Sequence, residues 1–282
     1  MSEMLNRISY YFSFPFVRHA LIVGVAVSLC AAIIGVTLVL KRYSFIGDGL
    51  SHVAFGAVAV ASVANLTDNT WLIILLTVVA AVFLLRTGNN SSTKGDAQIA
   101  MLSVGALAVG YMLLHAFSAS SNISGDVCST LFGSTSIISL QKKDVLFSCI
   151  LSGIVLVLLI LLYNRIFAVT FDENFARATG IKAEIYNLLL AVIIALIIVM
   201  GMKFVGSLLI SALIVFPSLT AMKLMQSFKQ VVIASAAIAV FAAAFGMIVS
   251  ILAQTPAGAT IVVVNIALYL IFSLVAKILK RG

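Results

Sequence analysis

The chain has 282 residues, of which 63% are apolar and 9% charged, and its mean hydropathy is +1.23. An ordinary soluble domain carries about 25% charged residues, so this composition excludes a soluble globular protein. The apolar residues form many long runs, which also excludes a soluble enzyme with one anchor or a cleaved signal peptide. The net charge of +8 comes from basic residues between these runs, which fits a membrane lipid surface and indicates no nucleic-acid partner.

We predict an all-α, polytopic membrane protein with about eight or nine transmembrane helices. The chain lacks the short alternating segments of a membrane β-barrel, and helices satisfy their own backbone hydrogen bonds in lipid. Cutting the chain at its polar breaks gives nine apolar stretches near the roughly 20 residues that span a bilayer core. They lie at 17–40, 46–64, 71–86, 97–117, 145–168, 185–202, 205–224, 230–253 and 258–277. Residues 1–282 therefore form one membrane domain, embedded over 17–277.

The positions of the basic residues predict the orientation. When the nine stretches alternate from an outside N-terminus, twelve of the 17 basic residues fall on the cytoplasmic side. They are Lys41, Arg42, Arg86, Lys94, Arg165, Arg177, Lys182, Lys223, Lys229, Lys277, Lys280 and Arg281. This bias predicts a multi-pass protein of the cell membrane with a cytoplasmic loop at 169–184. The Ser- and Gly-rich residues 125–140 are too polar for a lipid-facing span and fit a re-entrant or interfacial segment.

The 169–184 loop reads VTFDENFARATGIKAE and predicts a short helix. Asp172 and Glu173 stand at its N-terminal end, where the helix dipole favours acids, and Gly180 provides a stop. By composition alone, this helix is either a solvated connector or a docking element for another protein.

One acid and histidine pair within the apolar stretches has the spacing of a metal site. Asp48 and His52 are four residues apart, which places a carboxylate and an imidazole on one helix face. Counting helical rise from Arg42 places His52 about 15 Å deep, with Asp48 about 6 Å shallower. Such ligands suit zinc or manganese, and two pairs in a homodimer would supply four. The spacing alone equally allows a hydrogen-bonded pair without metal.

Other polar residues and absent motifs narrow the alternatives. His19, His115 and Lys203 fit interfacial positions at the outer side, with Gly201 and Gly206 permitting a tight turn beside Lys203. Pro217 can break or kink its span. The sequence has no phosphate-binding loop of the G-x-x-x-x-G-K-[ST] type, so we do not expect this chain to hydrolyse ATP that way. The motifs H-E-x-x-H and G-x-S-x-G are also absent, which excludes the simplest membrane metalloprotease and serine protease functions.

Several segments together resemble a known family, the membrane permease subunit of bacterial ABC importers for zinc, manganese or iron. The resemblance follows the family's order along nearly the whole chain. It is carried by LVLKRYSFIGDGLSHVAFGAVA at 38–59, LFGS at 131–134, FDENFARATGI at 171–181, VGSLLISALIVFPSLTA at 205–221 and PAGATIVV at 256–263.

The resemblance implies a transporter subunit that is not itself an enzyme. The expected partners are a cytoplasmic ATP-binding subunit, an extracytoplasmic metal-binding protein and a second copy of the permease. The family's G-D-x-x-S-H motif matches here, which implies that Asp48 and His52 are ligands on the translocation path. The 171–181 segment implies that Phe171, Asp172, Ala176 and Gly180 form the element that couples to the ATPase. We expect zinc first and manganese next as the transported ion, and no permanently bound cofactor.

Two other functions are compatible with the same pair. A secondary transporter driven by an ion gradient would use Asp48 and His52 as a proton relay and would need no ATPase. An intramembrane metalloenzyme would need further ligands and a general acid or base nearby.

Overall fold

The computed structural model describes residues 10–64, 70–90, 95–117 and 142–279, and within these ranges every regular element is a helix. Seven of the described helices are long and apolar enough to cross a membrane, and two shorter apolar helices accompany them. The prediction of an all-α polytopic membrane protein is therefore confirmed. The segment 125–140 lies outside the described residues.

Each of the nine predicted stretches corresponds to a helix that the structure describes. These helices are α2 (Pro15–Leu40), α3 (Ile46–Val63), α4 (Thr70–Asn90), α5 (Gly95–Phe117), α7 (Lys142–Leu161), α10 (Ala183–Val205), α11 (Ser207–Met222), α12 (Phe228–Ala253) and α13 (Ala257–Ile278). Two short helices, α8 (Tyr163–Phe171) and α9 (Glu173–Ala178), lie between α7 and α10.

The fifth predicted stretch, 145–168, is wrong as a single span. It breaks at Leu162 into α7 and the amphipathic α8, in which Ile166 and Val169 are buried while Phe167 is exposed. Hydropathy alone does not reveal the break between α7 and α8, because α8 has apolar residues on both its faces. The predicted 169–184 loop is also too wide, since Val169 belongs to α8 and Glu184 to α10.

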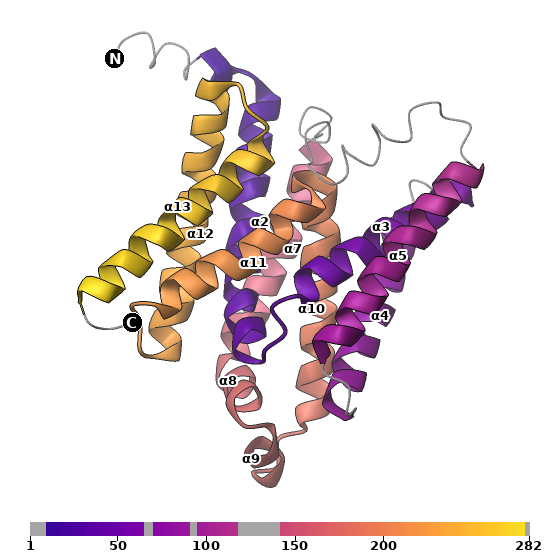
Figure 1. Cartoon of the computed structure of the whole chain (residues 1–282), viewed down its shortest axis with the longest axis vertical. Coiled ribbons are helices and arrows are strands. Elements are labelled where there is room, and N and C mark those ends of the chain that lie inside the picture. Colours follow the sequence, from indigo (N-terminus) through magenta and orange to yellow (C-terminus); the bar gives the residue numbers. More distant parts are fainter. Residues whose placement is uncertain (1–9, 65–69, 91–94, 118–141, 280–282) are drawn as a thin grey trace.

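The helices form one bundle whose two ends differ (Figure 1). In Figure 1, α2 begins at the top of the bundle, whereas α8 and α9 lie below its lower end, where α10 begins. We call this the α9 end. The turn between α10 and α11 lies at the opposite end, where Gly206 adopts a φ of 97° that favours glycine. The predicted tight turn beside Lys203 is confirmed.

The helices α2, α11 and α12 pack closely around small and hydroxyl residues. Ser235 donates a hydrogen bond to the carbonyl oxygen of Ala32 at 3.2 Å, and the Ser218 hydroxyl lies 2.9 Å from the Ile214 carbonyl oxygen. Gly35 faces the same carbonyl, and a Cβ at position 35 would collide with it and lie 2.7 Å from the Ser218 Oγ. Helix α11 also continues through Pro217 without a break. These contacts fix α11 against α2.

We expect Gly35→Ala to destabilise the bundle, because the new methyl group meets backbone that cannot rotate away. Overpacking of this kind costs about 1–3 kcal/mol, which exceeds the gain of about 1 kcal/mol from replacing a helical glycine. Gly153→Ala is the matched control, since a Cβ there meets nothing within 4 Å. The thermal unfolding midpoint in detergent should fall for Gly35→Ala alone. Equal midpoints for the two variants would contradict this packing.

Candidate functional site

The turn that connects α2 to α3 sets the position of the Asp48 and His52 pair. Helix α2 ends at Leu40. Just beyond it, Arg42 has a φ of 63°, and the Tyr43 N–H donates to the Leu38 carbonyl at 2.9 Å. Together with the bond from the Arg42 N–H to Val39 at 3.1 Å, this is a Schellman motif. Helix α3 then begins at Ile46, so Asp48 lies in its first turn and His52 in its second.

This start point sets where the pair lies along α3. The estimate of about 15 Å for His52 assumed helical rise from Arg42, and that assumption is wrong because residues 41–45 form the turn. Measured from Ile46 at roughly 1.5 Å per residue, Asp48 lies about 3 Å and His52 about 9 Å along α3. The pair is therefore close to the N-terminal end of α3, and its depth in the membrane stays a prediction.

Asp48 and His52 point toward each other without closing a hydrogen bond. The His52 Nε2 lies 3.6 Å from the Asp48 Oδ1, and the His52 Nδ1 is buried without a hydrogen-bond partner. Two ligands that each bind one ion at about 2.1 Å with a tetrahedral angle would be about 3.4 Å apart. The observed separation therefore suits a shared cation with little movement of either side chain.

Asp48 lines a groove of about 780 Å³ between α3, α11 and α13. Its side chain is 45% exposed, whereas that of His52 is 16% exposed. Of the described residues that line the groove, Asp48 is the charged one, and Ser44 and Ser211 add hydroxyl groups. The remaining walls are apolar, from Phe45, Leu209, Ala212, Val215, Phe216, Leu219, Gly258, Ala259, Val262 and Val263. A cation entering this groove would meet one carboxylate.

One chain supplies only part of a coordination shell. Among the residues that the structure describes, no group of three or more His, Cys, Asp or Glu side chains is placed to hold a metal ion. Asp48 and His52 thus provide two ligands, and further ligands must come from water, from hydroxyl groups or from another copy of the chain.

Local capping chemistry builds the second predicted element, α9. The Asp172 Oδ1 accepts a hydrogen bond from the Phe175 N–H at 2.9 Å, which caps the helix N-terminus. At the other end, Gly180 has a φ of 83° and Ile181 donates to the Ala176 carbonyl at 2.9 Å, a second Schellman motif. The short helix and its glycine stop are confirmed.

The predicted coupling residues divide into buried and exposed ones. Ala176 is fully buried against Val169 and Ala183, so it holds α9 on its neighbours and does not face a partner. Phe171 is 58% exposed. Phe175 is 64% exposed as well, and the sequence reasoning did not include it among the coupling residues. The signal was present in the sequence, because Phe167, Phe171 and Phe175 follow one another at a spacing of four residues.

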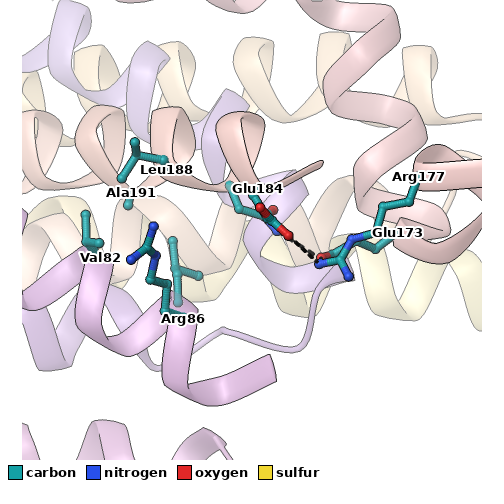
Figure 2. A pocket seen from close by; sticks show the side chains of 9 residues that line it. Val82, Arg86, Glu173, Arg177, Glu184, Leu188 and Ala191 are labelled. Atoms are coloured by element: carbon teal, nitrogen blue, oxygen red, sulfur yellow. Dashed lines mark hydrogen bonds and ion pairs between the residues drawn. The ribbon is translucent and has the colours of Figure 1, made fainter. Parts of the chain in front are cut away.

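Ion pairs hold α9 against the start of α10 (Figure 2). The Arg177 Nη2 lies 2.7 Å from the Glu173 Oε1 and 3.7 Å from the Glu184 Oε1. A cavity of about 60 Å³ separates this group from α4, and Figure 2 shows Arg86 on the α4 wall, across from Glu173 and Arg177. The junction between α9 and the bundle is therefore polar and incompletely filled.

The remaining sequence candidates lie away from the pair. His115 is at the last turn of α5, exposed and stacked on Tyr111 with ring centroids 6.5 Å apart. His19 lies in the first turns of α2, also at the end opposite α9. Lys203 is in the last turn of α10, and its side chain is outside the described part. The structure brings neither His19 nor His115 to Asp48.

Comparisons with known proteins identify the family. The ABC 3 transport family matches residues 13–276. The manganese import system permease protein ScaB of Streptococcus gordonii is 27% identical over 272 residues, which are 95% of each protein. The chelated iron transport system membrane protein YfeD of Yersinia pestis is 27% identical over 288 residues, 99% of this chain and 92% of that protein.

A solved structure agrees with these relatives. The structure described as PsaBC from Streptococcus pneumoniae in complex with Fab has a TM-score of 0.82 and 28% identity, and the match covers 95% of this chain and 94% of that one. The family match and the relatives each extend over nearly the whole chain. The chain belongs to the ABC 3 transport family and is a multi-pass membrane permease of a metal ABC importer, not itself an enzyme.

Proposed function

We propose that this permease carries a divalent first-row transition ion into the cell along the groove that Asp48 lines. The observation that carries the proposal is the 3.6 Å approach of the Asp48 Oδ1 and the His52 Nε2 at the edge of an otherwise apolar groove. An ionisable pair in such surroundings is costly to maintain unless it serves a polar cargo. The ion is cargo, and no resident cofactor takes part.

Manganese is the first cargo that we propose, ahead of zinc. Carboxylate oxygen suits manganese and imidazole nitrogen suits several first-row ions, while no thiolate lines the groove in the described residues. The relatives reported above are named for manganese and chelated iron, so they give no specific support to the zinc expected from the motif. Zinc is the second candidate because it also accepts oxygen and nitrogen ligands.

A homodimer would complete the site. Asp48 and His52 leave at least two positions of a four-coordinate shell unfilled, and a second copy facing the same groove would supply two identical ligands. The apolar walls contributed by α11 and α13 would then be covered by the partner, while lipid would cover the outward faces of the bundle. Transport also requires that the ion leaves, which an incomplete or shared site allows.

The α9 end is the side on which we place the ATPase. A permease of an ABC importer works with an ATP-binding subunit and a substrate-binding protein. Exposed rings for docking are offered by Phe171 at the end of α8 and Phe175 on α9. Arg42, Arg165, Lys223 and Lys277 lie near helix termini at this same end, which supports a cytoplasmic position. The metal-binding protein would then deliver its ion at the opposite end.

Replacement of either proposed ligand should stop metal import. We expect Asp48→Asn and His52→Ala each to lower the uptake of radiolabelled manganese at least about tenfold, because each removes a direct ligand. His115→Ala is the matched control, since His115 lies at the far end of α5 and should leave uptake unchanged. Wild-type uptake by either ligand variant would contradict the site. Stronger competition by unlabelled zinc than by manganese would reverse the proposed order of cargo.

Replacement of the exposed ring on α9 should weaken the ATPase complex. We expect Phe175→Ala to reduce the affinity for the ATPase at least about tenfold, as for a contact residue worth about 1.4 kcal/mol or more. Phe117→Ala is the control, because Phe117 is similarly exposed at the end of α5 opposite α9. Affinity is measured by titrating the purified ATPase against the detergent-solubilised permease. Unchanged affinity for Phe175→Ala would exclude α9 as the docking element.

A further inference from the structure

A chain of three side chains connects α9 to the end of α2. The Lys41 Nζ donates to the Asn187 Oδ1 at 2.6 Å, and the Asn187 Nδ2 donates to the Glu173 Oε2 at 3.1 Å. These residues belong to three separate segments, since Lys41 caps α2, Asn187 is in the first turns of α10 and Glu173 begins α9. The neighbouring Arg177 donates to the other Glu173 oxygen at 2.7 Å.

The donors and acceptors of this chain are fixed by its two cationic ends. Lysine and arginine only donate hydrogen bonds, so Asn187 must turn its oxygen to Lys41 and its amide to Glu173. Glu173 must then accept from both sides. A change of one hydrogen-bonding group at position 173 or 187 therefore leaves two donors or two acceptors facing each other.

The chain surrounds the Lys41 ammonium group with acceptors. Burial lowers the pKa of Lys41, and the nearby Glu173 carboxylate opposes that shift. An ammonium group withdrawn from water needs a hydrogen-bonded acceptor, and Asn187 supplies one. Removal of the Asn187 amide would leave both charged neighbours without their shared partner.

Lys41 stands immediately before the turn that places the proposed metal ligands. The Schellman motif at Arg42 and Tyr43 follows it directly, and the Ile46 N–H donates to the Tyr43 carbonyl at 3.0 Å as α3 begins. Six residues separate Lys41 from Asp48. A displacement of α9 that is carried to Lys41 therefore reaches the first turn of α3 through a hydrogen-bonded turn.

We propose that Asn187 is a positioning residue that transmits movement of α9 to the metal-binding helix α3. The inference rests on the proposed function, because it takes α9 as the ATPase contact and α3 as the carrier of the ligands. It adds a residue outside both elements, on α10, through which the two are joined.

A reversal of hydrogen-bond polarity tests this role. In Asn187→Asp alone, the new carboxylate faces the Glu173 carboxylate, so two acceptors meet. In Glu173→Gln alone, the glutamine oxygen can accept from Arg177, but its amide then faces the Asn187 amide, so two donors meet. In the double variant, the carboxylate at position 187 accepts from Lys41 and from the new amide at position 173, whose oxygen still accepts from Arg177. The chain is restored with its central bond reversed. Asn164→Asp is the matched control, since it makes the same change at an exposed residue of α8 outside this chain.

The readout is the ATP-dependent labelling of a thiol in the groove. Phe45→Cys, in a background without Cys30, Cys128 and Cys149, places a thiol at an exposed groove position next to α3. Labelling is measured in the permease–ATPase complex with and without ATP, and metal uptake is measured in parallel. We expect ATP to change the labelling rate in the parent and in Asn164→Asp. Both single variants should lose most of this change while the ATPase still co-purifies, and the double variant should recover it.

The outcomes separate this inference from the proposed function. Single variants that keep the full ATP-dependent change, or a double variant no better than the singles, would overturn the role of Asn187. A parent complex that imports metal without an ATP-dependent change at position 45 would overturn it as well. Failure of the proposed function would instead appear as absent metal uptake by the wild-type complex. If thermal stability alone follows the single and double pattern, Asn187 is only structural.

Discussion

A carboxylate and an imidazole on one face of a membrane helix need water, each other or a cation, and this requirement governs the rest of the bundle. Asp48 meets it at the edge of a groove, where nearly half of its side chain is exposed, while His52 lies deeper on the same helix. Their position depends on where α3 begins. The turn after Lys41 sets that point, and it places the pair in the first two turns of α3.

The same short helix, α9, is attached to the bundle in two chemically different ways. Its polar side chains reach α2 through Asn187, whereas the ring of Phe171, just before it, contacts Phe228 at the start of α12 with centroids 5.9 Å apart. Helix α12 in turn packs with α2 and α11 around Ala32 and Ser218. A protein that pushes on α9 would therefore act on both sides of the groove, through α3 on one side and α11 on the other.

Local chemistry was readable from the sequence, and tertiary packing was not. Hydropathy located a helix at each of the nine predicted stretches. The acids at the start of α9 and the Gly180 and Gly206 conformations followed from residue type, because these features depend on near neighbours in the chain. The burial of Ala176 and the break between α7 and α8 depend on what packs against them. Lys41 and Asn187 are 146 residues apart, so no spacing rule could have joined them.

The central claim is that movement driven by ATP at α9 carries a metal ion past Asp48 and His52. The most direct measurement is the uptake of radiolabelled manganese by proteoliposomes that contain the permease, its ATPase and the metal-binding protein. The account predicts manganese uptake when ATP is supplied on the face of the liposome membrane that carries the ATPase, without any ion gradient. It predicts no uptake when a proton gradient is applied without ATP. Uptake driven by the proton gradient alone would contradict the account, because the pair would then serve as a proton relay.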